Sequence, residues 1–125
     1  MKNYRELNVW KNGVEIVKMT YQISKMIPST EKFGIISQMT RAAVSIPANI
    51  AEGSSRYSEK DYVRFLQIAL GSAFELQTYF IIVTEMLWVS SKEIITIQKK
   101  LEEEIKMIQA FMNTINRNQN KQTKS

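Results

Sequence analysis

The regular spacing of apolar residues constrains the fold of this chain more than any other feature of its sequence. Apolar side chains recur every three or four residues in four separate blocks, and no sustained alternation typical of strands occurs. The blocks predict helices at about residues 7–27, 31–53, 59–88 and 91–116. Four helices of this length joined by short loops favour an all-α, antiparallel, up-down-up-down four-helix bundle.

Local signals mark the ends of these helices. Pro28 ends the first one, because the residue before a proline avoids the α region. Gly53-Ser54-Ser55 is predicted to close the second helix as a C-terminal cap and turn. Capping-box patterns at Ser58-Glu59-Lys60-Asp61 and Ser90-Ser91-Lys92-Glu93 predict the starts of the third and fourth helices. Pro47 lies inside the second block and predicts a kink, since proline lacks an N–H and crowds the preceding turn.

The apolar pattern also defines the extent of the domain. On the third helix the predicted core seam consists of Tyr62, Leu66, Ala69, Ala73, Leu76, Phe80, Val83 and Leu87. The bundle is predicted to occupy residues 1–116. Residues 117–125 contain no apolar residue, which predicts a basic, disordered tail.

Composition excludes most enzyme chemistry. The chain has 125 residues, enough for one domain, and contains neither histidine nor cysteine. It therefore lacks the residues for Ser–His–Asp catalysis, for thiolate or histidine metal sites and for disulfides. We expect no catalytic residue, no metal site and no cofactor, and thus a protein that is not an enzyme.

The charge of the chain points to a different class of function. Seventeen basic and 12 acidic side chains give a net charge of +5, of which residues 117–125 supply +3. A basic excess favours contact with nucleic acid or another anionic surface, although +5 also lies within the range that solubility alone requires. The candidate phosphate-binding residues are Arg41, Arg56, Lys60, Arg64, Arg117, Lys121 and Lys124.

Polar residues also follow one side of the second helix, next to its apolar face. Together with two residues of the third helix they form a candidate structural network of Gln38, Arg41, Ser45, Asn49, Glu52, Ser72 and Glu75. Three interpretations remain open: a solvated helix face, a polar network between helices or subunits, and a functional surface that contacts phosphates. The network interpretation predicts a bidentate ion pair between Arg41 and Glu75.

Several runs of the sequence carry a family resemblance. They are Leu7-Asn8-Val9-Trp10, Pro28, Glu31, Phe33-Gly34, the run from Gln38 to Gly53, Arg56, and the run from Phe65 to Leu76. Over about residues 5–115 the chain resembles the bacterial four-helix bundle proteins encoded in intervening sequences of 23S ribosomal RNA genes. It is similar, more distantly, to the accessory protein of diversity-generating retroelements.

This resemblance implies a ring-shaped homopentamer without established enzymatic activity. The retroelement relatives are basic and act through nucleic acid and a reverse transcriptase partner, so the resemblance also implies RNA or DNA as a partner. The main alternative is a structural scaffold or protein-binding ring that makes no contact with nucleic acid and serves an unidentified protein partner.

No targeting segment is expected in this sequence. The first residues lead into an amphipathic stretch and not into the uninterrupted apolar region of a signal peptide. The most apolar segment, Tyr79 to Val83, is too short to span a bilayer. We therefore expect a cytoplasmic protein that does not associate with membranes.

Overall fold

The chain folds into four α-helices. The computed structural model describes the backbone of residues 3–124 and the side chains of residues 3–119. The helices are α1 (Asn8–Ser24), α2 (Ile35–Ser54), α3 (Glu59–Glu85) and α4 (Ser91–Lys124), and two short 3-10 helices, η1 (Tyr4–Glu6) and η2 (Ser29–Glu31), precede α1 and α2. The described residues contain no strand. The predicted all-α fold with four helices is confirmed.

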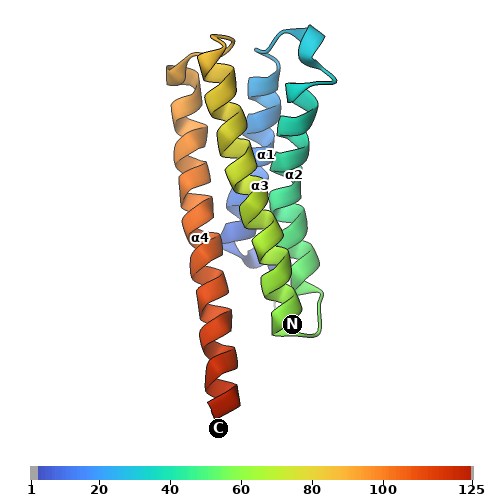
Figure 1. The fold of residues 1–125 in the computed structure, drawn as a ribbon, viewed down its shortest axis with the longest axis vertical. Coiled ribbons are helices and arrows are strands. Elements are labelled where there is room, and N and C mark those ends of the chain that lie inside the picture. The colour runs from blue at the N-terminus through green and yellow to red at the C-terminus, as the bar shows by residue number, and fades with distance from the viewer. Residues whose placement is uncertain (1–2, 125) are drawn as a thin grey trace.

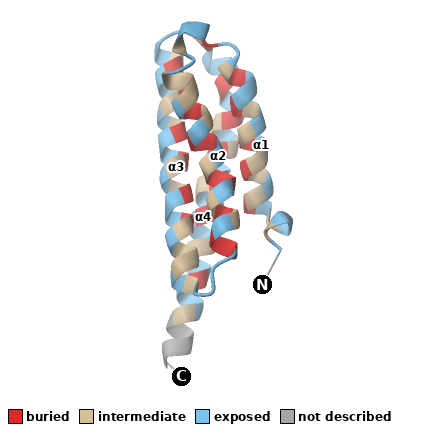
Figure 2. Cartoon of the chain, turned by 90° about the vertical axis from the view of Figure 1, so that its right-hand side faces the viewer, coloured by how far each residue is buried: buried red, intermediate tan, exposed pale blue. Residues whose placement is uncertain are grey.

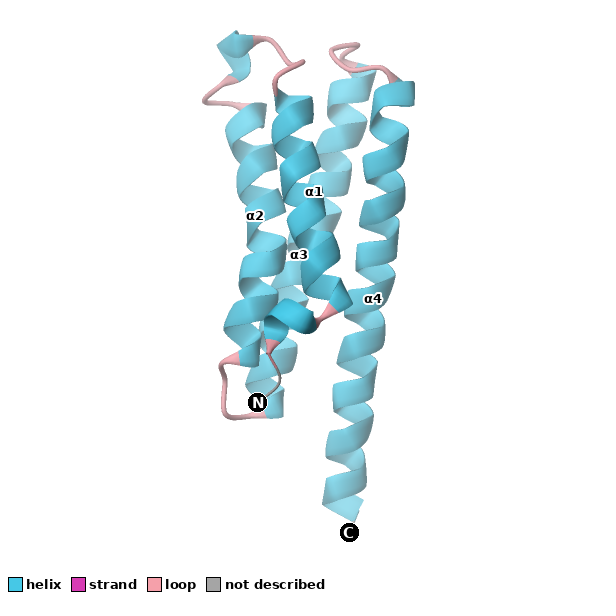
Figure 3. Cartoon of the chain, turned by 180° about the vertical axis from the view of Figure 1, so that it is seen from behind, coloured by secondary structure: helices cyan, strands magenta, loops and turns pink. Residues whose placement is uncertain are grey.

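The helices pack as a bundle in which each has two neighbours. Helix α1 contacts α2 and α4, and α3 likewise contacts α2 and α4. In Figure 1 the chain runs up α1, down α2, up α3 and down α4, so consecutive helices point in opposite directions. Figure 3 shows the same arrangement from behind, with η1 beside the start of α1.

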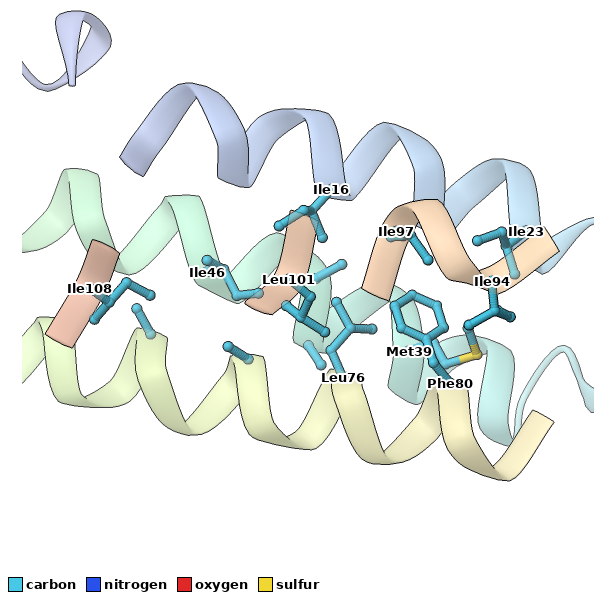
Figure 4. Packing of buried hydrophobic residues seen from close by; sticks show 14 of the residues in the cluster. Ile16, Ile23, Met39, Ile46, Leu76, Phe80, Ile94, Ile97, Leu101 and Ile108 are labelled. Carbon is cyan, nitrogen blue, oxygen red and sulfur yellow. The ribbon is translucent and has the colours of Figure 1, made fainter. Parts of the chain in front are cut away.

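A single hydrophobic core runs between the four helices. Figure 2 places the buried residues along the sides of the helices that face one another, and Figure 4 shows their side chains meeting in the middle. On α3 the buried positions are Leu66, Ala69, Ala73, Leu76, Phe80 and Val83, as the seam predicts. The seam ends there, because Leu87 is 89% exposed.

Helix α3 is shorter than predicted at its C-terminal end. It ends at Glu85, and Leu87 has a φ of 63°, in the left-handed region that reverses the chain. The next helix begins with a reciprocal capping box: the Glu93 amide donates to Ser90 Oγ over 3.3 Å, and the Ser90 amide donates to Glu93 Oε1 over 3.2 Å. At the start of α3, Ser58 Oγ accepts from the Asp61 amide over 3.0 Å.

Two glycines allow close packing rather than chain reversal. Helix α2 ends within the predicted segment Gly53-Ser54-Ser55, with Ser55 as its C-cap, and a Cβ on Gly53 would come within 2.8 Å of Tyr62 Cδ1. A Cβ on Gly13 of α1 would lie 3.4 Å from the Cβ of Pro47. Helix α2 continues through Pro47, and the kink at this residue stays a prediction.

The C-terminal segment differs from the expected disordered tail. Helix α4 continues to Lys124 and reaches past the loop between α2 and α3 (Figures 1 and 3). Once a helix is nucleated, each further residue adds a hydrogen bond, and Arg, Gln and Lys are good helix formers. An apolar face is therefore not needed to extend the helix here.

Helix α3 is also the one described helix that is long and apolar enough, by length and composition, to cross a membrane. The core helix of a bundle meets the same criterion, and α3 contributes six residues to this core.

Candidate nucleic-acid interface

Three of the predicted phosphate-binding residues gather where α2 ends and α3 begins. Arg56 lies in the connecting turn, and Lys60 and Arg64 occupy the first turns of α3. The guanidinium groups of Arg56 and Arg64 both lie over the ring of Phe65, at 4.6 and 4.7 Å from its centroid. One aromatic ring thus holds two cations at the same end of the bundle. We call Arg56, Lys60 and Arg64 the basic end cluster.

Carboxylates orient the two guanidinium groups. Arg56 Nη2 donates to Glu52 Oε1 one turn earlier in the chain, and Arg64 Nε lies 3.5 Å from Asp61 Oδ1. Each guanidinium carries five N–H donors, so donors remain for a further acceptor. Among the described side chains Lys60 forms no ion pair. The cluster consists of two oriented guanidinium groups and an exposed ammonium group.

A shallow groove connects this cluster to α4. Its volume is about 320 Å³, and its polar lining consists of Lys60, Asp61, Arg64 and Gln67 from α3 and of Asn116 and Gln119 from α4. Amide and cationic side chains are the groups that contact phosphate and sugar in nucleic-acid complexes. The structure therefore brings α4 close to the basic end cluster.

The C-terminal part of α4 adds positive charge without any acidic residue. From Ile105 to Ser125 the sequence contains Lys106, Arg117, Lys121 and Lys124 and neither Asp nor Glu. Arg117 is exposed and directly follows Asn116, which lines the groove. Lys121 and Lys124 are also predicted to bind phosphate, but their side chains are outside the part of the chain whose side chains the structure describes.

Arg41 does not belong to this interface. It is exposed in the middle of α2, 13 residues before Ser54, which corresponds to roughly 20 Å along the helix. A shallow depression of about 320 Å³ surrounds it, lined also by Gln38, Glu75 and Tyr79. The structure thus separates Arg41 from the other candidate arginines.

The predicted ion pair between Arg41 and Glu75 does not form within the single chain, and a pair between subunits stays a prediction. Both side chains are exposed, and no ion pair joins them among the residues described. At the surface a long flexible cation gains little from a single carboxylate, since water solvates both groups. Glu52 instead pairs with Arg56.

The small polar residues of the predicted network do connect α2 to α3. Ser45 Oγ and Ser72 Oγ lie 2.8 Å apart, and Asn49 Nδ2 donates to Ser45 Oγ and to the Ser45 carbonyl, each over 2.8 Å. This part is a hydrogen-bonded contact between helices. Gln38, Arg41, Glu52 and Glu75 form the solvated margin beside it.

The fold and the central sequence run agree with one family. Residues 5–110 match the family described as "23S rRNA-intervening sequence protein". The chain belongs to this family. Its fold is similar to the crystal structure of a protein of unknown function from the S23 ribosomal protein family of Bacteroides thetaiotaomicron. The TM-score is 0.77 and the identity 23%, over 83% of this chain and 97% of that one. Among curated proteins none matches this chain.

The sequence patterns do not predict that one ionisable residue, Glu104, is buried. Glu104 of α4 is fully buried against α1, where Asn12 Nδ2 donates to its Oε1 over 3.1 Å and Oε2 has no hydrogen-bond partner. Burial raises the pKa of Glu104 to about 7, and the hydrogen bond from Asn12 opposes this shift. A carboxyl group with this pKa exchanges its proton near neutral pH.

The signal for Glu104 is present in the sequence. Glu104 stands three residues after Leu101 and four before Ile108, and this spacing places it on the side of the helix that faces the core. The neighbouring Ile105 also fits the apolar spacing, so the pattern assigns the core position to Ile105 and does not single out Glu104. Within the described residues no group of three or more acidic side chains comes together to hold a metal ion.

Proposed function

We propose that this protein is a non-enzymatic RNA-binding bundle that contacts phosphates with one end. The observation that carries the proposal is the pair of guanidinium groups held over Phe65, next to Lys60. Orienting Arg56 and Arg64 before binding reduces the conformational entropy lost when they contact a phosphate. The family is named for an intervening sequence of ribosomal RNA, so RNA is the first ligand to test.

The shape of the interface favours binding that depends weakly on sequence. Apart from Asp61, which pairs with Arg64, its polar groups are cations and amides on helix surfaces, which suit backbone phosphates and sugars. Binding of this kind releases counterions, so affinity falls as salt concentration rises. The acid-free part of α4 extends the positive surface along the ligand.

Salt-dependent anisotropy tests the proposal. A labelled RNA stem-loop is titrated with the protein at about 50 and 200 mM salt, a range in which several phosphate contacts lose orders of magnitude in affinity. The double variant Arg56→Ala/Arg64→Ala is expected to reduce the slope of log K against log salt by about one to two. Arg41→Ala removes one positive charge away from the cluster, against two in the double variant, and serves as the control, with an unchanged slope.

Two results would overturn this assignment. The first is an equal loss of slope per removed charge in Arg41→Ala, which would show that net charge and not the cluster matters. The second is an absence of RNA binding at about 50 mM salt. That second outcome leaves the alternative, a scaffold or protein-binding assembly.

We further propose that the protein assembles with copies of itself, as a ring of five subunits. The support is the outward side of α3, where the large apolar residues Ile68, Phe74, Ile81 and Ile82 are exposed. Gly71 lies within this face, and a Cβ there would meet no atom within 4 Å in the single chain. An apolar helix face with a glycine in its middle suits close packing against another helix.

A further inference from the structure

A pocket of the bundle lies beside the basic end cluster. It has a volume of about 460 Å³ and opens where the end of α2, the start of α3 and the C-terminal part of α4 meet. This volume lies within the range of small-molecule sites. Arg56 lines this pocket, and its guanidinium group lies over Phe65 in the proposed phosphate-binding surface.

Aromatic side chains form much of the wall. Tyr62 and Phe111 pack edge to face, with ring centroids 5.3 Å apart and an interplanar angle of 72°. Tyr57 lines the same pocket and is otherwise exposed to solvent. An exposed aromatic ring next to a rigid aromatic pair provides surfaces on which a planar ligand stacks.

One polar group of the pocket lacks a partner. Glu59 lines the pocket at the first turn of α3, and its Oε2 is buried without a hydrogen-bond partner among the described residues. Buried acceptors are nearly always satisfied in folded proteins. Once the Glu59 side chain turns this oxygen toward the pocket, a ligand that donates N–H groups to the carboxylate would supply the missing hydrogen bond.

We propose that this pocket receives an unstacked guanine base of a bound RNA. Guanine presents two adjacent donors, N1–H and N2–H, which match the two oxygens of a carboxylate. Adenine and cytosine place a ring acceptor beside their amino group, and uracil has a single N–H between two carbonyls. In each of these three bases an acceptor faces one oxygen of Glu59. The proposal rests on the proposed RNA binding and adds base selectivity to it.

Short single-stranded probes test the selectivity with the full chain. The probes are labelled uridine octamers with one central guanosine or one central adenosine, titrated at about 50 mM salt. We expect the guanosine octamer to bind about tenfold tighter or more, since each lost bidentate contact is worth roughly that factor. Glu59→Gln is expected to abolish this difference and to keep the salt-dependent binding of both probes.

A matched variant controls for charge and folding. Glu75→Gln removes one carboxylate from an exposed position of α3 outside the pocket and should keep the guanine preference. Tyr57→Ala changes an exposed residue and should weaken guanosine-octamer binding about tenfold through lost stacking. Melting curves of all three variants verify that they fold.

The outcomes separate this inference from the proposed function. Equal affinity for both octamers with steep salt dependence overturns the guanine pocket and leaves RNA binding in place. Binding of guanosine monophosphate that Glu59→Gln removes, without binding of any RNA, supports the pocket and overturns the proposed function. Absence of binding for every probe overturns both.

Discussion

Glu104 couples the folding of this small bundle to the binding of a proton. Its pKa is raised to about 7 in the folded chain, against about 4.3 for an unperturbed glutamate. Between these two values the native state binds more protons than the unfolded state, so the free energy of unfolding falls as pH rises. The loss is on the order of 3 kcal/mol between pH 4.5 and 7.5 and then levels off.

Glu104→Gln is expected to remove this pH dependence. The amide stays neutral, so above pH 7 the variant should be more stable than the wild type, and near pH 5 the two should be similar. Urea unfolding of both proteins at about pH 5 and pH 8 measures the difference. If both proteins lose the same stability between these pH values, Glu104 does not ionise inside the bundle.

Gly53 provides a second prediction for a single residue. In Gly53→Ala the new methyl group would lie within 2.8 Å of Tyr62 Cδ1 and 3.1 Å of Phe65 Cβ, so α2 and α3 must move apart. We expect a loss of about 1–3 kcal/mol in the free energy of unfolding. The control is Gly71→Ala, which meets no atom within 4 Å and should gain up to about 1 kcal/mol. Both variants are measured in dilute solution, so that self-association does not contribute to the free energy of unfolding. A gain in stability in both variants would contradict the close contact at Gly53.

These residues show what a sequence pattern reveals and what it does not. Helical spacing identifies the positions that face the core, such as Leu76 and Phe80. It does not identify which polar partner a surface arginine selects, because several carboxylates lie within reach of a flexible side chain. Arg56 therefore pairs with Glu52, four residues earlier in the chain, whereas Arg41 and Glu75 form no ion pair within the single chain.

At the scale of elements, hydrogen bonds from small side chains hold α2 against α3. Ser72→Ala removes the hydrogen bond to Ser45 Oγ, while Asn49 still donates to that oxygen. The expected cost is about 0.5–1.5 kcal/mol in the free energy of unfolding. Arg41→Ala on the same face should stay within about 0.5 kcal/mol of the wild type. Thermal melts compare the two, and a larger loss in Arg41→Ala would restore the ion-pair interpretation.

The ends of the elements were harder to predict than their centres. Four apolar blocks correspond to four helices, and the reciprocal contacts of Ser90 and Glu93 agree with the predicted capping box. Capping patterns predict the start of a helix because their side chains accept hydrogen bonds from backbone N–H groups only a few residues away. The end of α3 depends instead on Leu87 adopting a positive φ, which a leucine does rarely. The groove of Lys60 and Arg64 with α4 depends on packing between distant segments, which no local pattern contains.

For the whole molecule, the proposed assembly places the outward face of α3 against another copy. Ile81 is 53% exposed in the single chain, and a charge at this position would have to be buried in such an interface. Ile81→Glu is therefore expected to dissociate the assembly into single chains of 14.5 kDa and to leave the core unchanged. Native mass spectrometry measures the mass, and circular dichroism verifies the helical content. Phe33→Glu is the matched control, since Phe33 is 91% exposed in the α1–α2 connection, away from this face. A wild-type protein that is a single chain at micromolar concentration, or an Ile81→Glu variant that keeps the wild-type mass, would reject α3 as the contact surface.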